Sequence, residues 1–241
     1  MRLHTVSHQY AENILETAFR DEWEQLLEVF GRVDPPLRPA EPFTTTGRPM
    51  TPKRQVRPLG GRRAHALLPI DQVALNDVVD AEFKALGWNR QPYVLGETLG
   101  TPLDSYLKGD FERSGVYVEV EFGNTASLFR DLFKFQVAGR SGIGKVGVLV
   151  VATAAVTRLF DSGVATYEQA VNLLPYMKIG LQLPTVVVGL DIVDWAPIEQ
   201  RYAEMYEVAT ANGITCHPFE VVRRTDDPTP PIPADPLTAK D

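Results

Sequence analysis

Cysteine and histidine, the residues of disulfides and zinc sites, are scarce in this sequence. It contains a single cysteine, Cys216, and four histidines, His4, His8, His65 and His217. One cysteine cannot form an internal disulfide or a cysteine-rich zinc site. This shortage excludes a disulfide-stapled fold and a cysteine-rich zinc site. We expect none of the four histidines to be catalytic.

Long apolar runs are also absent. No stretch approaches the roughly 18 to 20 continuous apolar residues that a membrane-spanning helix requires. The first residues lead into a polar helical pattern rather than the apolar core of a secretory signal. We therefore expect a cytoplasmic protein with no membrane association.

An excess of positive charge is the third feature that the sequence lacks. With 24 basic and 31 acidic residues the formal net charge is −7, which is not typical of a protein that coats nucleic acid. Residues 31–66 are nevertheless rich in arginine, proline, glycine and threonine, which predicts a basic loop. Its basic residues are Arg32, Arg38, Arg48, Lys53, Arg54, Arg57, Arg62 and Arg63. Such a local basic surface can follow phosphate groups whatever the total charge; the alternative is an ordinary solvated loop.

Apolar residues recur with two different periods along the chain. Helical spacing is found in residues 10–30, 71–86, 125–137, 167–179 and 198–211. Residues 146–152 and 183–190 are continuous apolar runs, which are typical of buried strands. Between residues 103 and 122 the period changes to two, which predicts a hairpin. Together these patterns predict an α/β fold, with a central mixed β-sheet flanked by helices.

The length favours one domain. A chain of 241 residues can bury one sizeable α/β core but is short for two. Prolines and polar residues become dense from residue 224 onward, a composition typical of disorder. We therefore predict a single domain over residues 1–223, followed by a disordered tail over residues 224–241.

The predicted hairpin carries the acidic residues of chemical interest. A two-residue turn at residues 114–115 makes the numbers of facing residues sum to 229. In this register the apolar side chains share one face, and Asp110 lies on the other face opposite Glu119, with Cβ atoms about 5 Å apart. Glu121 follows on the same face. Because like charges that face each other destabilise a sheet, the pair needs a compensating cation.

Two interpretations of this acidic face are open. Acidic residues that alternate along a strand are often only its solvated side. The strand is, however, followed by a helix and two strongly apolar strands, which predicts a central position. A central strand has little reason to keep an acidic face unless a cleft opens there. Since Mg²⁺ is held by one or two carboxylates together with phosphate oxygens and water, the second interpretation is a magnesium site at Asp110 and Glu119.

The same stretch resembles a known family. The signature consists of Asp110-Phe111, Glu119-Val120-Glu121-Phe122 and Asn124. At this spacing it is similar to the BglII/BstYI restriction endonucleases of the PD-(D/E)XK nuclease superfamily. The resemblance extends loosely from about residue 8 to residue 195. The sequence departs from the superfamily at Glu121, where most members have lysine, although the BglII branch tolerates other residues there.

The resemblance implies the function and the site. It implies a PD-(D/E)XK endonuclease core and a type II restriction endonuclease, which hydrolyses double-stranded DNA at a short palindrome and leaves 5′-phosphates, with Mg²⁺ as cofactor. Asp110, Glu119 and the backbone carbonyl of Val120 would hold the metal, and Glu121 would orient or deprotonate the attacking water. Glu97 is either an ancillary acidic residue of the site or a surface glutamate.

The resemblance also suggests where DNA is contacted. Asn124 directly follows the catalytic strand, where an amide can reach a phosphate or a base edge. The loop 158–166 is similar to the segment with which the family reads bases. Its suitable donors and acceptors are Arg158, Asp161 and Ser162; the alternative is that each is an ordinary loop residue. Arg62 and Arg63 of the basic segment would contact phosphates and supply affinity rather than specificity.

A palindromic site predicts a homodimer, because two copies related by a two-fold axis read the two half-sites. The predicted helix over residues 125–137 has more apolar side chains than one short helix needs to cover a sheet. They are Leu128, Phe129, Leu132 and Phe133. We therefore predict this helix as the subunit contact.

Two other functions are open at this point. Another PD-(D/E)XK nuclease, of the repair or structure-specific kind, would cut without a defined site, and a non-catalytic DNA-binding α/β domain would not cut at all. A second question concerns Asp104, which also precedes the Glu-x-Glu strand. Asp104 lies roughly 20 Å before Asp110 along an extended strand, so the hairpin geometry favours Asp110 as the metal ligand.

Overall fold

A six-stranded mixed β-sheet, in the order β1-β8-β7-β6-β5-β4, forms the centre of the protein. The structure is a computed structural model that describes residues 1–40, 55–56, 64–65, 67–95, 107–160, 163–177 and 181–223. The strands of this sheet are β1 (Arg2–His8), β4 (Asn89–Arg90), β5 (Phe111–Arg113), β6 (Val116–Glu121), β7 (Val146–Ala152) and β8 (Thr185–Asp191). β6, β7 and β8 run parallel, whereas β1, β5 and β4 are antiparallel to their neighbours. The predicted α/β fold with a mixed sheet is confirmed.

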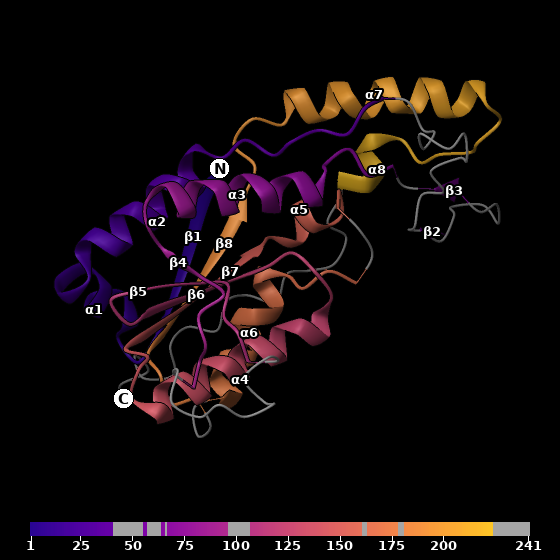
Figure 1. Ribbon diagram of the computed structural model, residues 1–241. Helices are drawn as coiled ribbons and strands as arrows, with labels where there is room; N and C mark the ends of the chain where they lie inside the picture. Colours follow the sequence, from indigo (N-terminus) through magenta and orange to yellow (C-terminus); the bar gives the residue numbers. More distant parts are fainter. Residues whose placement is uncertain are drawn as a thin grey trace, which may run out of the picture.

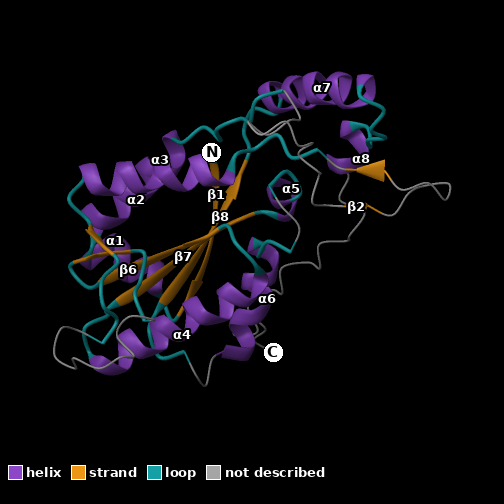
Figure 2. Cartoon of the chain, turned by 45° about the vertical axis from the view of Figure 1, so that its right-hand side comes forward, coloured by secondary structure: helices purple, strands orange, loops and turns teal. Residues whose placement is uncertain are grey.

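Helices cover both faces of this sheet (Figures 1 and 2). On one face lie α1 (Ala11–Ala18), α2 (Arg20–Arg32) and α3 (Gln72–Ala85). On the other face lie α4 (Thr125–Ser141) and α6 (Tyr167–Met177). Three further helices lie toward one end of the sheet: α5 (Ala154–Thr157), α7 (Ala196–Ala211) and α8 (Phe219–Arg223).

β7 shows why the sheet has a core on each face. All of its residues are buried. Val148 and Val150 pack into the cluster that contains α2 and α3, and Leu149 and Val151 pack into the cluster that contains α4 and α6. Successive side chains of a strand point to opposite faces, so a strand covered on both faces must be apolar throughout. The predicted strand over 146–152 is confirmed, and the run over 183–190 forms a strand that begins at Thr185.

The predicted helices are confirmed with shifts at their ends. Asp71 caps α3 by accepting hydrogen bonds from the backbone N–H groups of Val73 and Ala74. α4 is longer than predicted and ends at Ser141, before Gly142 in the left-handed conformation. α5 and α8 are too short to produce a periodic pattern, and the sequence did not predict them.

β1 corrects the prediction that the first residues lead directly into a helix. It pairs antiparallel with β8, from Arg2 opposite Asp191 to His8 opposite Thr185. Most of its side chains are only half-buried, because β1 lies at the edge of the sheet. Backbone hydrogen bonds rather than apolar side chains hold an edge strand of this kind, so hydrophobic periodicity carries little signal for it.

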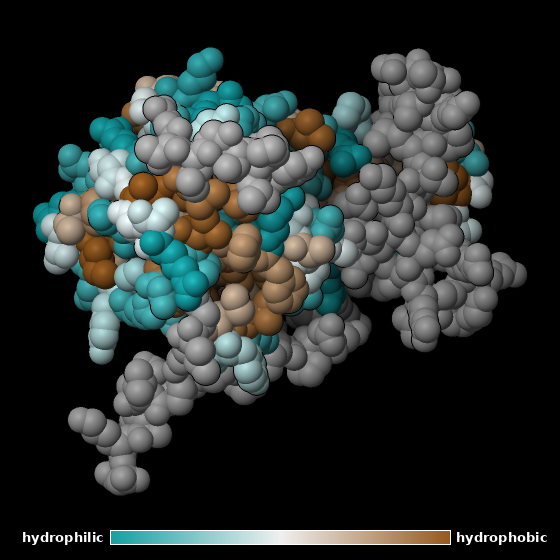
Figure 3. All heavy atoms as spheres, turned by 60° about the horizontal axis from the view of Figure 1, so that its bottom comes forward, coloured by the Kyte–Doolittle hydropathy of each residue, from teal (hydrophilic) through white to brown (hydrophobic). Residues whose placement is uncertain are grey.

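The predicted apolar face of α4 proves to be two separate stripes. Leu128 and Leu132 are buried against the protein's own sheet, whereas Phe129 and Phe133 are 49% and 55% exposed. Residues four apart lie on the same side of a helix, so each pair forms its own stripe. Only the stripe of Phe129 and Phe133 is open to a subunit contact. Figure 3 turns the α4 side of the molecule forward and shows apolar side chains gathered among hydrophilic ones.

Several predicted features lie outside the described residues. They are Arg48, Lys53, Arg54, Arg57, Arg62, Arg63, Glu97, Asp104, Asp161, Ser162 and the tail over 224–241. Within the basic segment, β2 (Gln55–Val56) and β3 (Ala64–His65) pair antiparallel, where the sequence predicted only loop. None of the helices in the described ranges combines the length and the apolarity needed to cross a membrane.

Candidate active site

The turn between β5 and β6 sets the register of the acidic face. Ser114 and Gly115 both have positive φ, 55° and 90°, as the two-residue turns that match the twist of a hairpin require. β5 then pairs with β6 so that Phe111 faces Val118. This is the predicted register, and β6 lies inside the sheet between β5 and β7.

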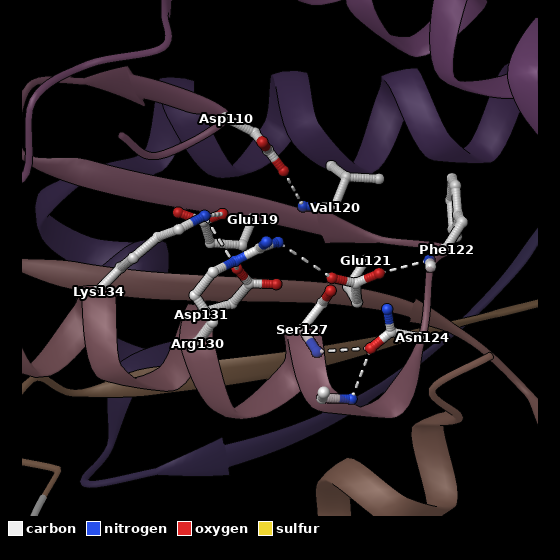
Figure 4. Close-up of polar contacts among 12 residues, drawn as sticks. Asp110, Glu119, Val120, Glu121, Phe122, Asn124, Ser127, Arg130, Asp131 and Lys134 are labelled. Carbon is white, nitrogen blue, oxygen red and sulfur yellow. Dashed lines mark hydrogen bonds and ion pairs between the residues drawn. The ribbon is translucent and has the colours of Figure 1, made fainter. Parts of the chain in front are cut away.

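Asp110 lies one residue before β5 and directs its carboxylate back to β6. Its Oδ2 accepts a hydrogen bond of 2.8 Å from the backbone N–H of Val120. Burial raises the pKa of Asp110, although the hydrogen bond from Val120 and the positive charge of Lys134 oppose this effect. Figure 4 shows Asp110 reaching β6 from the neighbouring chain segment, while Glu119 and Glu121 point from β6 toward α4.

Glu119 is buried in the middle of the site and is 1% exposed. Its Oε2 accepts a hydrogen bond of 2.6 Å from Nζ of Lys134, whereas its Oε1 is buried without a hydrogen-bond partner. Burial raises the pKa of Glu119 well above its usual range, the negative charge of Asp110 adds to this, and Lys134 opposes it. A Cβ atom on Gly109 would lie 3.1 Å from Oε1, so a glycine there keeps space beside this oxygen.

Glu121, on β6, is the third carboxylate of the site, after Asp110 and Glu119. Its Oε1 accepts a hydrogen bond from the backbone N–H of Gly123, and its Oε2 lies 3.7 Å from Nη2 of Arg130. Burial, followed by the negative charge of Asp131, raises the pKa of Glu121 to about 7. The carboxyl group is therefore held in one orientation and changes its protonation state near neutral pH.

Three charged residues of α4 complete this site: Arg130, Asp131 and Lys134. Nζ of Lys134 lies 2.9 Å from Oδ1 of Asp131, and both side chains are buried. Nε of Arg130 lies 3.4 Å from the same Oδ1. Burial alone lowers the pKa of Lys134, but the negative charges of Glu119 and Asp131 outweigh burial and raise it. The ammonium group thus stays charged between two carboxylates.

The donor set fits a magnesium ion that shares its ligands with a substrate. Among the described residues, no three His, Cys, Asp or Glu side chains converge as a ready-made metal site. Mg²⁺ does not need such a cage, because it takes one or two carboxylates and completes its coordination with phosphate oxygens and water. Asp110 and Glu119 provide the carboxylates, and the buried Oε1 of Glu119 is an acceptor that a cation would satisfy.

The family follows from a comparison of the chain with family models. The model of the restriction endonucleases BglII/BglIII matches residues 3–190, which is most of the chain. The chain belongs to this family. It is therefore a type II restriction endonuclease, a hydrolase that cuts DNA at specific sites.

Solved structures agree with this assignment of the fold. The endonuclease is similar in structure to restriction endonuclease BglII in its crystal structure complexed with a DNA 16-mer. The TM-score is 0.58 and the sequence identity is 17%, and the match covers 80% of this chain and 79% of that chain. It is also similar to free BglII, with a TM-score of 0.50 and 18% identity over 80% of each chain. No curated protein matches the chain.

The predicted DNA-contacting elements of the endonuclease lie side by side. Asn124 forms a β-bridge with Val164, and the backbone N–H of Thr125 donates to the carbonyl of Gly163. The end of β6 thus adjoins the loop that contains Arg158. The Oδ1 of Asn124 caps α4 by accepting hydrogen bonds from the backbone N–H groups of Ala126 and Ser127, so Asn124 has a structural task that the sequence prediction did not foresee.

Sequence reasoning missed Asp131 and Lys134, although the sequence carries a signal for them. Both fall on the inward side of α4: Asp131 lies three residues after the buried Leu128, and Lys134 lies four residues before the buried Ala138. Charged residues inside an apolar stripe are rarely buried unless they are paired. Their position therefore indicated partners on the facing strand.

Proposed function

We propose that this endonuclease hydrolyses double-stranded DNA at a short palindromic site, in a Mg²⁺-dependent reaction that leaves 5′-phosphates. The observation that carries the proposal is the buried Oε1 of Glu119, which has no hydrogen-bond partner and lies on a central strand near Asp110. A divalent cation would satisfy this oxygen and neutralise the two carboxylates. The DNA 16-mer bound to BglII supports duplex DNA as the substrate.

Asp110, Glu119 and the backbone carbonyl of Val120 would hold the metal. When bound, Mg²⁺ polarises the phosphoryl oxygen, lowers the pKa of a water molecule and stabilises the leaving 3′ oxygen. The protein fixes the ligands beforehand, because the N–H of Val120 orients the Asp110 carboxylate. Glu119 is also held in place, because its buried Oε2 accepts a hydrogen bond from Nζ of Lys134.

Glu121 would handle the proton of the attacking water. A general base works best when its pKa is near the working pH, and the pKa of Glu121 is raised to about 7. The hydrogen bond from Gly123 fixes Oε1, and Oε2, which lies 3.7 Å from Nη2 of Arg130, would be the atom that orients the water and takes its proton.

We further propose that the enzyme acts as a homodimer and that Asn124, Arg158, Asp161 and Ser162 lie at the DNA, with Arg62 and Arg63 contacting phosphates. The adjacency of Asn124 to the loop after Arg158 supports a common DNA-facing edge. The exposed Phe129 and Phe133 on α4 support a subunit contact there.

The decisive experiment compares two aspartates. Asp110→Asn should abolish cleavage of plasmid DNA in Mg²⁺ while gel shifts in Ca²⁺ show retained DNA binding, because only a metal ligand is lost. Asp104→Asn, the matched control, should keep most of the activity. A dead Asp104 variant beside an active Asp110 variant would refute this metal site. Cutting without defined fragments would favour a structure-specific nuclease, and binding without any cleavage by the unmodified enzyme would favour a non-catalytic domain.

A further inference from the structure

Lys134 places a positive charge where the active site is otherwise acidic. Its side chain is 5% exposed, and Nζ lies 2.6 Å from Oε2 of Glu119 and 2.9 Å from Oδ1 of Asp131. An ammonium group loses several kcal/mol of hydration when it is buried, so it stays inside the protein only with close anionic partners. Without another cation, Lys134 is the counter-charge of Glu119.

This arrangement creates a competition for Glu119. The ammonium occupies Oε2, and Oε1 is the oxygen without a hydrogen-bond partner. A divalent cation bound to Oε1 would add positive charge to the same buried carboxylate that already pairs with Nζ, and like charges at one buried group repel each other. Lys134 therefore opposes metal binding while no further negative charge is present.

We propose that Lys134 is a positioning residue that holds Glu119 in the metal-free enzyme and makes strong divalent-cation binding depend on DNA. A DNA phosphate brings both negative charge and acceptor oxygens, so that the metal and the ammonium no longer compete for Glu119 alone. The inference rests on the proposed metal site at Asp110 and Glu119. Its consequence is an enzyme that carries little metal until it meets DNA.

The test measures Mn²⁺ binding to the free protein by titration calorimetry, with no DNA present. Lys134→Met removes the charge and keeps the length of the side chain, and we expect it to bind Mn²⁺ about tenfold or more tightly than the unmodified protein. Arg140→Met is the matched control, because it makes the same charge change at an exposed position of the same helix. The control should change the affinity by less than about twofold.

A double variant shows whether the gain in Mn²⁺ affinity comes from relieved competition at Glu119 or from a change in the total charge of the site. It also reduces the risk that the variant misfolds. Lys134→Met together with Asp131→Asn removes one positive and one negative charge, so the net charge equals that of the unmodified protein. Compared with Lys134→Met alone, it also avoids a buried Asp131 carboxylate that has lost Lys134 as its partner. We expect it to keep the gain in Mn²⁺ affinity, and thermal unfolding in EDTA confirms that each variant is folded.

The outcomes are distinct. A gain in Mn²⁺ affinity in the double variant, absent in Arg140→Met, supports the role of Lys134. If the folded double variant binds Mn²⁺ as weakly as the unmodified protein, or more weakly, the proposed role of Lys134 is overturned. A lysine with only a structural role would give this result, because its removal would disturb the metal ligands without relieving any repulsion. Absence of Mn²⁺ binding in every folded protein, with and without duplex DNA, overturns the proposed metal site as well. Plasmid cleavage by the unmodified enzyme, measured in parallel, tests the proposed function separately.

Discussion

At the scale of single residues, the carboxylates of the active site oppose folding. Burial raises the pKa of Asp110, Glu119 and Glu121, which means that their ionised forms are less favourable in the folded chain than in water. A cation that binds only the folded protein reverses this penalty. The chemistry of the site and the stability of the metal-free protein are therefore in conflict.

Glu121 allows a quantitative test of this conflict. Its pKa is about 7 in the folded protein and 4.5 in the reference state. As the pH rises above about 4.5 the unfolded chain releases its proton first, so this group lowers stability progressively up to about pH 7 and fully above it. Glu121→Gln should therefore increase the free energy of unfolding on the order of 2 kcal/mol at about pH 8 and have little effect near pH 4.

The measurement is urea unfolding in EDTA across this pH range. Glu207→Gln, at an exposed position of α7, is the matched control and should give no pH-dependent gain. If Glu121→Gln changed the free energy of unfolding by the same amount at all pH values, the raised pKa of Glu121 would not be the cause of the change.

At the scale of elements, periodicity predicts those parts of the chain that packing alone determines. β7 is apolar because both of its faces are covered, and the hairpin register follows from a turn that only residues tolerant of positive φ adopt. The same reasoning did not predict β1, whose stability comes from backbone pairing. It also missed Lys134, which has one carboxylate partner on its own helix and a second on another element. The juxtaposition of Asp110 and Glu119, the proposed metal ligands, was accessible from sequence since both residues belong to one hairpin.

The turn that fixes this hairpin is sensitive to one substitution. Gly115 has a φ of 90°, and a Cβ there would lie 3.2 Å from the backbone oxygen of Ile143. Gly115→Val should lower the free energy of unfolding by about 2 kcal/mol or more, because a branched side chain is strained at positive φ. Gly31→Ala, in α2 with nothing within 4 Å of the added Cβ, should instead change stability by no more than about 1 kcal/mol, in the favourable direction. Denaturant unfolding of both variants makes the comparison, and an unaffected Gly115 variant would argue against this turn.

At the scale of the whole molecule, α4 joins two tasks. Its inward side supplies Asp131 and Lys134 to the candidate active site, and its outward side exposes Phe129 and Phe133. If a second copy packs on the outward side, the two active sites are held at a fixed separation by the same helix pair. A two-fold symmetric enzyme needs such rigidity to cut both strands of a palindrome.

The oligomeric state tests this role of α4. The unmodified enzyme should give twice the chain mass of 26.8 kDa in light scattering. Phe129→Glu with Phe133→Glu should give a single chain mass, because buried charges in an apolar contact are strongly unfavourable. Val73→Glu, which changes an exposed apolar residue of α3 on the opposite face of the sheet, should leave the dimer intact. An unmodified enzyme that cuts DNA at the mass of one chain would contradict the homodimer.

The pairing of β1 with β8 has a consequence for the order of events during biosynthesis. Arg2 pairs with Asp191 and His8 with Thr185, so β1 cannot complete this pairing until β8, the last strand of the described sheet, has been synthesised. Contacts between such distant parts of a chain are slow to form. Until then β1 and the open edge of β7, onto which β8 later adds, are exposed pairing surfaces. The nascent chain is therefore most prone to aggregation in the interval between translation of β7 and of β8.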